Sequence, residues 1–385
     1  ANLGAVDLDG KAVAISTGYY HSCTLLEGGF VKCWGHNGQG QLGYGDTRQR
    51  GDDGNEMGVY LPSVDLDGSK AVAIECGLLF SCALLEGGFV KCWGDNGYGQ
   101  LGYGDTRYRG DGGGEMGVNL PAVDLGGTAL ALITGEHHSC VLLADMTVKC
   151  WGYNNEGQLG YGDTRPRGDG GGEMGAYLPA VDLDGRAVMI LGGGRFSCAL
   201  LENGALKCWG YNGWGQLGYQ DTRQRGDGGG EMGAYLPAVD LGGTAVAVFA
   251  SNQHSCALLE GGFVKCPPRH RPLEHHELGS AVLHAAILRF RIDPSMIRLV
   301  RGRKGCGDLY WILSQLHAFG GRLRREAASL APRELTWIRR TKGCVGLARW
   351  GGIQMPAPEN VFRAHSRPTA TPPALWNAVS APAAR

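Results

Sequence analysis

One pattern, a pair of cysteines separated by nine residues, returns five times and sets the spacing of most of the chain. The pairs are Cys23 with Cys33, Cys82 with Cys92, Cys140 with Cys150, Cys198 with Cys208, and Cys256 with Cys266. Successive pairs are offset by 59, 58, 58 and 58 residues, and a nearly constant offset is typical of a repeat architecture rather than of one irregular globular domain. The fold of residues 1–266 is therefore predicted from the fold of one repeat.

Each pair of cysteines encloses a predicted β-hairpin. Apolar residues alternate on both sides of Glu27-Gly28-Gly29, which indicates two strands joined by a three-residue loop with glycine available for positive φ. Folding the chain there places Cys23 opposite Cys33 and Leu25 opposite Val31. Facing residues on antiparallel strands have Cα atoms about 4.5 to 5.5 Å apart, and this range overlaps the separation that a disulfide requires.

The facing cysteines leave three alternatives. We predict an intra-hairpin disulfide in each repeat, but a pair of buried thiols would fill the same space. Zinc fits less well, because nine intervening residues and no recurrent second pair do not match the usual ligand spacing. Disulfides would place the protein outside the cell or in the secretory pathway, whereas free thiols would favour the cytoplasm or nucleus.

Each repeat is predicted to contain four short antiparallel strands, which makes the fold all-β. In the first repeat these are residues 11–16, the two arms of the hairpin and residues 61–66. Four complete repeats are followed by the first three strands of a partial fifth at 244–266. Four-stranded units with this kind of period, punctuated by glycine and aromatic residues, are typical of the blades of a β-propeller. The propeller is therefore predicted to be incomplete or five-bladed.

Residues 5–8 match the last strand of the later repeats. We expect them to complete the blade that begins at 244–266, which would close a ring of five blades. The alternative is that the sequence is a fragment of a larger propeller. The chain starts without a methionine or an apolar signal core, so the sequence leaves open whether a secretion signal precedes it.

The full repeat resembles a known family. Residues 18–43 follow the pattern Gly-x-x-His-Ser-Cys-x-Leu-Leu-x-x-Gly-x-Val-Lys-Cys-Trp-Gly-x-Asn-x-x-Gly-Gln-Leu-Gly. This pattern is similar to the regulator of chromosome condensation repeat family, in the superfamily of propellers like the β-lactamase inhibitor protein. The resemblance covers residues 1–266 and implies propeller blades, of which the family usually closes seven into a ring. The repeat is longer here, and the excess falls in residues 46–58 and their equivalents.

The resemblance implies two classes of function. The first is a non-catalytic protein–protein interaction module. The second, by likeness to the founding member, is a guanine-nucleotide exchange factor for a small GTPase, although no residue here maps onto that activity. The Gly-Trp-Arg-His-Thr motif of the family's plant ultraviolet-B photoreceptor is absent, and residues 267–385 do not resemble the HECT ubiquitin-ligase domain to which some family members are fused.

Residues 267–385 differ from the repeats in charge and composition. The repeats hold 17 Lys and Arg against 30 Asp and Glu, whereas residues 267–385 hold 19 against 7 and are rich in Arg, Ala and Pro. We predict two domains, with propeller repeats at 1–266 and a basic tail at 267–385. The tail contains candidate helices at 279–290 and 308–330. It is either disordered, a small helical appendage that binds nucleic acid or an acidic partner, or a frame-shifted end that is not cognate sequence.

The sequence predicts no enzyme, cofactor or metal site. It lacks the nucleophile elbow, the phosphate-binding loop and the His-Glu-x-x-His pair. No run of 18 or more apolar residues predicts a membrane span. The histidine that recurs as His21, His138 and His254 is replaced by Phe80 and Phe196 in the other repeats, which indicates packing rather than catalysis.

Two further recurrent features are interpreted as structural. The tryptophans that end the hairpin, at positions 34, 93, 151 and 209, are predicted to be core anchors. Arg-Gly-Asp occurs at 50–52, 109–111, 167–169 and 225–227. We interpret it as a loop device in which arginine and aspartate pair between neighbouring loops, rather than as an adhesion motif. A calcium site at Asp169 and Glu173 has too few oxygen ligands.

Positions that vary within the fixed repeat are the predicted binding face. Loops on a rigid scaffold commonly carry specificity, and Tyr, Trp and charged side chains commonly anchor interfaces. The alternative is ordinary drift at exposed sites. The candidate binding residues are Tyr19, His36, Gln39, Asp95, Tyr98, Tyr153, Glu156, Tyr211 and Trp214. The expected partner is a protein, with a small GTPase as one possibility and nucleic acid only through the basic tail.

Overall fold

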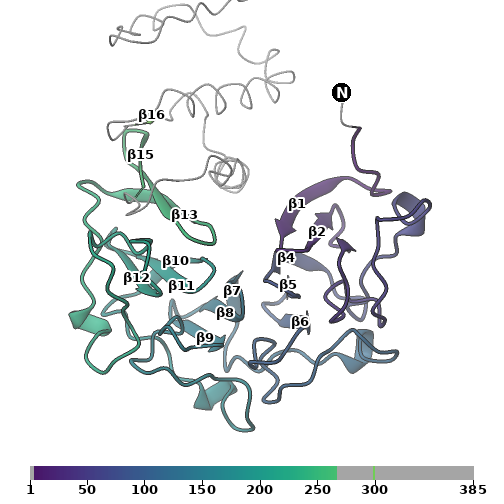
Figure 1. Cartoon of the computed structure of the whole chain (residues 1–385), viewed down its shortest axis with the longest axis horizontal. Helices are drawn as coiled ribbons and strands as arrows, with labels where there is room; N and C mark the ends of the chain where they lie inside the picture. The colour runs from purple at the N-terminus through teal and green to yellow at the C-terminus, as the bar shows by residue number, and fades with distance from the viewer. Residues whose placement is uncertain (1–3, 267–297, 300–385) are drawn as a thin grey trace, which may run out of the picture. The chain divides into compact units, whose positions relative to one another are not determined.

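The computed structural model of the protein describes residues 4–266 and 298–299. Contacts divide the chain into residues 1–327 and 328–385, and all described residues belong to the first unit. They form five antiparallel sheets of three consecutive strands, and the fifth sheet gains a short parallel strand (Figure 1). The two candidate helices predicted in the tail lie outside the described residues.

The strands and 3-10 turns have the following bounds: β1 Ala12–Thr17, β2 His21–Leu26, β3 Val31–Gly35, η1 Gly58–Tyr60, β4 Ala71–Cys76, β5 Phe80–Leu85, β6 Val90–Gly94, η2 Gly117–Asn119, β7 Ala129–Thr134, β8 His138–Leu143, β9 Val148–Gly152, η3 Gly175–Tyr177, β10 Ala187–Gly192, β11 Phe196–Leu201, β12 Leu206–Gly210, η4 Gly233–Tyr235, β13 Ala245–Ala250, β14 Ser255–Leu259, β15 Phe263–Lys265 and β16 Arg298–Leu299. The first to fifth blades are β1–β3, β4–β6, β7–β9, β10–β12 and β13–β15. The all-β propeller prediction is confirmed, with four repeats and a partial fifth. No helix of the described residues is long and apolar enough to cross a membrane.

The hairpin register agrees with the prediction. Leu25 pairs with Val31 between β2 and β3, and the two cysteines of the first hairpin face each other. The register is fixed because the pleat alternates with a period of two, so a slip by one residue would move the buried cysteines to the opposite face. The same facing of cysteines recurs in the second, third and fourth blades.

All five predicted cysteine pairs form disulfides within their hairpins. The bonded pairs are Cys23 with Cys33, Cys82 with Cys92, Cys140 with Cys150, Cys198 with Cys208, and Cys256 with Cys266. Their Cα atoms lie 4.0–4.2 Å apart, which is slightly closer than the 4.5 to 5.5 Å expected of facing residues. The last pair differs in its place in the fold, because β15 ends at Lys265 and Cys266 lies just beyond the strand. The alternatives of paired thiols and of zinc do not apply to these hairpins.

Each of the first four sheets has three strands where four were predicted, so the predicted fourth strand needs correction. Residues 61–66 run beside β3, and the Val64 amide donates to the Val31 carbonyl at 2.8 Å. Pro62 has no amide proton and cannot extend a ladder. Burial of Leu61 and Leu66 instead fixes this segment in the core.

The predicted closure of the fifth blade by residues 5–8 is also wrong for the described chain. The strand that pairs with β15 is β16, in parallel, through Phe263 opposite Arg298. The Asp7 carbonyl accepts a hydrogen bond from Gly58 of the first repeat at 3.0 Å. Asp65 and Gly117 make the same contact one repeat later, at 3.1 Å. Residues near Asp7 thus have the role of a repeat linker.

Neighbouring blades pack through apolar side chains and one recurrent indole hydrogen bond. Trp93 is fully buried, and its indole N–H donates to the Gln41 carbonyl of the preceding repeat at 3.0 Å. Trp151 and Trp209 make the same bond with Gln100 and Gln158. These three tryptophans are the predicted core anchors, whereas Trp34 of the first blade is only half-buried.

The Arg-Gly-Asp loops are structural, but their pairing differs from the prediction. Arg50 pairs with Asp46 of its own loop at 2.8 Å rather than with an aspartate of a neighbouring loop. A guanidinium four residues after a carboxylate reaches it without leaving the turn, so no neighbour is needed. Neighbouring loops instead touch through backbone, because the Gly45 amide donates to the Gly110 carbonyl at 3.0 Å.

The hairpin turn yields a prediction, because the third repeat has Met146 where the others have glycine. Met146 has a φ of 66°, and Gly29 has a φ of 84° at the equivalent position. A left-handed backbone costs a non-glycine residue about 1 to 2 kcal/mol. We expect Met146→Gly to raise the free energy of unfolding by up to about 1 kcal/mol, since glycine's freedom in the unfolded chain returns part of the gain.

The converse change, Gly29→Met, should lower the free energy of unfolding by more than Met146→Gly raises it. A Cβ at Gly29 would lie 2.6 Å from the Lys70 Cβ and 3.1 Å from its Cα, so strain adds to the φ cost. Chemical denaturation measures the free energy of unfolding of both variants. A neutral Gly29→Met together with a destabilised Met146→Gly would show that the turn does not need a left-handed residue.

Candidate protein-binding face

The bends that precede each second strand lie at the same end of the blades as the loops that follow each third strand. The His36 amide donates to the Tyr20 carbonyl at 2.8 Å, which joins the two segments in the first blade. Backbone hydrogen bonds also join bends of successive blades, from the Glu136 amide to the Gly194 carbonyl and from the Gly194 amide to the Asn252 carbonyl. We call this end the bend face: residues 18–20, 77–79, 135–137, 193–195 and 251–254, with loops 36–41, 95–100, 153–158 and 211–216.

Three aromatic rings from two blades gather on the bend face. The ring centroid of Tyr98 lies 5.1 Å from that of His137 and 4.8 Å from that of Tyr153. The rings of His137 and Tyr153 are 6.3 Å apart, and all three contacts are edge-to-face. This is a favoured geometry for aromatic pairs. Tyr98 keeps 42% of its surface exposed, so the cluster presents a rigid ring to solvent.

Asp95 lies beside this cluster. Its carboxylate accepts hydrogen bonds from Gln100 Nε2 at 2.9 Å and from the Gly97 amide at 3.0 Å. His137 Nδ1 lies 3.8 Å from Asp95 Oδ2. Burial lowers the pKa of His137 below its usual value and outweighs the opposing effect of Asp95 and Glu136. The imidazole is therefore mostly neutral near pH 7.

A second cluster of polar side chains joins the first, third and fourth blades. The Tyr19 hydroxyl donates to Glu136 Oε1 at 2.7 Å, and Arg195 Nε donates to Glu136 Oε2 at 2.8 Å. Burial opposes ionisation of Glu136, but the hydrogen bonds from Arg195 and Tyr19 outweigh it and lower the pKa of that carboxyl. Glu156 lies 3.8 Å from Arg195 Nη1 and accepts from Gln224. Arg195 is thus shared by two carboxylates.

The structure brings together some of the predicted binding residues. Tyr98 and Tyr153 contact each other, and Glu156 and Tyr19 meet through Arg195 and Glu136. The others lie in equivalent loops. In the first repeat the backbone N–H of Gln39 donates to Gln41 Oε1, and Gln41 Nε2 hydrogen-bonds His36 Nδ1. In the fourth repeat the backbone N–H of Trp214 donates to Gln216 Oε1. Tyr211 is half-buried.

Glu136 lies at the variable position equivalent to Tyr19, but sequence reasoning missed two other residues that hold the face together, His137 and Arg195. A signal was available, because both residues before each second strand vary between repeats. These pairs are Tyr19-Tyr20, Leu78-Leu79, Glu136-His137, Gly194-Arg195 and Asn252-Gln253. The contacts themselves depend on how blades pack, which the sequence of one repeat does not report.

The recurrent histidines have a structural environment. His21 Nε2 lies 2.8 Å from Ser81 Oγ of the second blade, and His138 Nε2 lies 3.0 Å from Ser197 Oγ. Both histidines are buried, and neither Nδ1 has a hydrogen-bond partner among the described residues. A catalytic Ser-His pair needs access for substrate and a group that orients the imidazole. These pairs have neither and join neighbouring blades.

The one cluster of metal-ligating side chains among the described residues is His21, Cys23 and Cys76. Cys23 is bonded to Cys33, so its sulfur is no thiolate ligand. Asp169 and Glu173, the two carboxylates judged too few for a calcium site, hydrogen-bond each other. Burial raises the pKa of Asp169, and the contact with Glu173 raises it further.

Comparisons with known proteins agree with the fold. Four segments match the model of the regulator of chromosome condensation (RCC1) repeat: residues 12–41, 71–100, 134–158 and 192–216. The chain is 31% identical over 220 residues to the ultraviolet-B receptor UVR8 of Arabidopsis thaliana, covering 56% of this chain and 45% of that protein. It is 32% identical over 205 residues to the mitochondrial RCC1 domain-containing protein RUG3 of the same plant, covering 52% and 42%.

A solved structure has a similar fold. The crystal structure of yeast RCC1 (Prp20) with Kap60 bound superposes with a TM-score of 0.50 at 22% identity, covering 66% of this chain and 55% of that chain. This similarity concerns the fold alone. The chain spans less than half the length of the two plant relatives. The matches over residues 12–41, 71–100, 134–158 and 192–216 show that these repeats are of the regulator of chromosome condensation (RCC1) repeat family.

Proposed function

We propose that residues 12–266 form a non-catalytic protein-binding module whose bend face takes a basic segment of a protein partner. The observation that supports this most is the exposed ring of Tyr98, held rigidly by His137 and Tyr153 beside a carboxylate. Rigid aromatic anchors next to charged groups are typical of interface hot spots. The variable positions of the repeat gather here, whereas the buried positions are nearly constant.

Charge argues for a basic partner. The repeats hold 17 Lys and Arg against 30 Asp and Glu. On the bend face, Asp95, Glu136 and Glu156 are balanced by Arg195 alone, because burial keeps His137 mostly neutral near pH 7. A lysine or arginine side chain of a partner can lie over the face of the Tyr98 ring and reach these carboxylates. A cation over an aromatic ring contributes about 0.5 to 2 kcal/mol.

A binding experiment with paired variants tests this proposal. Wild-type protein is titrated with labelled arginine- and lysine-rich peptides and with peptides in which glutamate replaces each basic residue. We expect the basic peptides to bind, and Tyr98→Ala to weaken binding by about 2- to 30-fold, from the energy of a cation over a ring. Binding should also weaken as salt is raised, because exposed charges are screened.

The control variants are Phe30→Ala and Phe89→Ala, at the hairpin end of the first two blades. These phenylalanines are 59% and 60% exposed, so they offer aromatic surface away from the bend face. They should leave binding unchanged. Equal binding of acidic peptides, or equal weakening by the phenylalanine variants, would contradict the proposal. Faster nucleotide release from small GTPases in the presence of the wild-type chain would favour the exchange-factor alternative.

We also propose that the protein resides in an oxidising compartment. Five bonded cysteine pairs, one in each blade, support this, since such bonds rarely persist in the cytosol or nucleus. Protein purified from its native source without reductant should give cross-linked hairpin peptides in mass spectrometry of non-reduced digests. Alkylated thiols at Cys82 and Cys92, or at Cys198 and Cys208, would instead favour a reducing compartment.

A further inference from the structure

Cys76 is a buried free thiol at the end of β4 in the second blade. The other blades hold Thr17, Thr134, Gly192 and Ala250 at this position, the last residue of the first strand. The fold therefore does not require a thiol there. The first strand of the second blade packs against the disulfide-bonded hairpin of the first blade, where Cys23 is bonded to Cys33.

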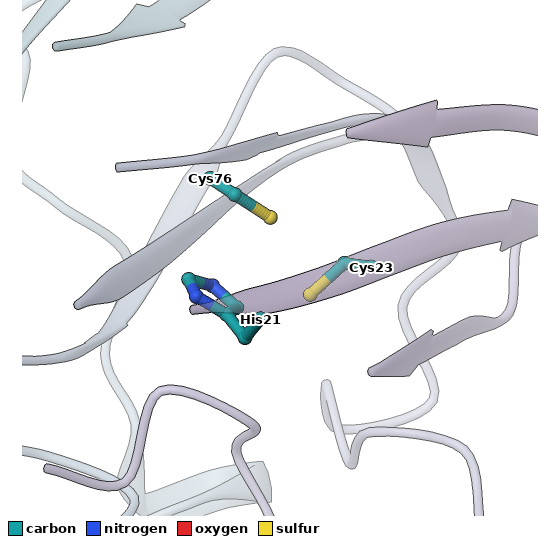
Figure 2. Close-up of side chains that lie close together, drawn as sticks. All are labelled: His21, Cys23 and Cys76. Carbon is teal, nitrogen blue, oxygen red and sulfur yellow. The ribbon is translucent and has the colours of Figure 1, made fainter. Parts of the chain in front are cut away.

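The side chains of Cys76, Cys23 and His21 face one another between these two blades (Figure 2). Their sulfur and ring-nitrogen atoms all lie within 4.8 Å of one another. The Ser81 hydroxyl is the group they share: its Oγ lies 3.6 Å from Cys23 Sγ, 3.9 Å from Cys76 Sγ and 2.8 Å from His21 Nε2. A free thiol thus lies close to one sulfur of an existing disulfide, among buried side chains that include polar groups.

We infer that Cys76 exchanges with the Cys23–Cys33 disulfide and forms an alternative Cys23–Cys76 disulfide that links the first and second blades. In this step the Cys76 thiolate attacks Cys23 Sγ. The new sulfur–sulfur bond forms as the Cys23–Cys33 bond breaks, and Cys33 leaves as a thiolate. Cys33 then takes up a proton in place of the one that Cys76 lost, so the exchange consumes no oxidant.

The environment of Cys76 sets the rate of exchange. Burial raises the pKa of the Cys76 thiol to about 12, although hydrogen bonds with Ser16 and Ser81 oppose this. The thiolate is the attacking species, so it is scarce near neutral pH and its amount rises tenfold with each pH unit below 12. The exchange should be slow at pH 7 and about 100-fold faster at pH 9.

The first test compares two matched variants in full-length protein in which Cys306→Ser and Cys344→Ser remove the tail thiols. Cys33→Ala leaves Cys23 beside Cys76. Cys150→Ala leaves Cys140 in the third blade, and Gly192 occupies the position of Cys76 in the next blade, the fourth. Both proteins are incubated with glutathione disulfide, which is reduced to two glutathione molecules as two protein thiols form a bond. Non-reduced digests are then mapped by mass spectrometry.

We expect Cys33→Ala to give a Cys23–Cys76 cross-linked peptide, and Cys150→Ala to leave Cys140 as a free thiol or a glutathione adduct with Cys76 unpaired. A glutathione adduct at Cys23 in the first variant would overturn the inference. A Cys76–Cys140 bond in the second would also overturn it, because pairing would then not reflect proximity in the fold.

The second test needs no change in the hairpin and covers the case in which Cys33→Ala does not fold. Protein with only the two tail substitutions is incubated at pH 7 and at pH 9, quenched in acid, alkylated under denaturing conditions and mapped. We expect the Cys23–Cys76 peptide to appear together with alkylated Cys33, about 100-fold faster at pH 9. Alkylation of Cys76 alone at both pH values would show that no exchange takes place.

Discussion

Replacing Trp151 with alanine should lower the free energy of unfolding by about 3 to 5 kcal/mol, the usual cost of removing a large aromatic side chain from a core. Trp151 is fully buried, and its indole donates to the Gln100 carbonyl of the second repeat at 3.0 Å. The ring packs so closely on that repeat that a Cβ added to Gly102 would lie 2.7 Å from the indole nitrogen. The substitution removes a contact that joins the second and third blades.

Trp34 supplies a matched control at the same position of the first blade. It is half-buried, and within residues 4–266 no hydrogen bond from its indole to a neighbouring repeat is found. Trp34→Ala should therefore cost at least about 1 kcal/mol less than Trp151→Ala, since it loses neither that hydrogen bond nor as much buried area. Urea denaturation of both variants measures the difference. Equal losses would show that the tryptophans stabilise each blade separately rather than the contact between blades.

The stability of the protein should fall as the pH drops from about 6.5 to 4, and His138 should account for part of this loss. Burial lowers the pKa of His138 to about 4, and the nearby His137 contributes in the same direction while Glu136 opposes it. The unfolded chain binds a proton near pH 6.5, which the folded chain does not bind until about pH 4. The folded state therefore loses roughly 3 kcal/mol across this window, at 1.36 kcal/mol for each unit of pKa difference.

His138→Phe separates this contribution from that of the carboxyl groups. Phenylalanine occupies the equivalent positions as Phe80 and Phe196, both fully buried, so the side chain fits the site. The Ser197 hydroxyl keeps its bond to the Gln158 carbonyl at 2.9 Å. We expect the variant to match the wild type within about 1 kcal/mol at pH 7.5 and to gain on it by roughly 3 kcal/mol at pH 4. If the free energy of unfolding changes with pH in the same way in the wild type and the variant, His138 has the same pKa in the folded and unfolded states.

The sequence was sufficient for the hairpin because its determinants are local. The alternation around Glu27-Gly28-Gly29 and the need for positive φ at Gly29 fix which residues face each other, so the pairing of Cys23 with Cys33 followed directly. The number of strands was less predictable. The run at 61–66 has the composition of a strand, but Pro62 cannot donate to a ladder and only one backbone hydrogen bond joins Val64 to β3.

The contacts of the bend face could not be predicted, because they join residues far apart in the chain. Tyr19 and Glu136 are 117 residues apart, and Arg195 and Glu136 are 59 apart. Residue types and variability pointed to Tyr98 and Tyr153, but their contact depends on the angle at which two blades pack. The prediction for the Arg-Gly-Asp loops was wrong for the opposite reason, because the contact is local. Arg50 pairs with Asp46, four residues before it, and needs no partner in a neighbouring loop.

Binding of a protein partner to the bend face can be measured by hydrogen exchange of the wild-type chain with and without a saturating arginine-rich peptide. We expect slower exchange of backbone amides in residues 77–79, 95–100, 135–137 and 153–158, and unchanged exchange at the hairpin loops 27–29 and 86–88. Protection at the hairpin loops, with none in residues 95–100 and 153–158, would show that the peptide binds elsewhere and that the bend face is not the binding surface.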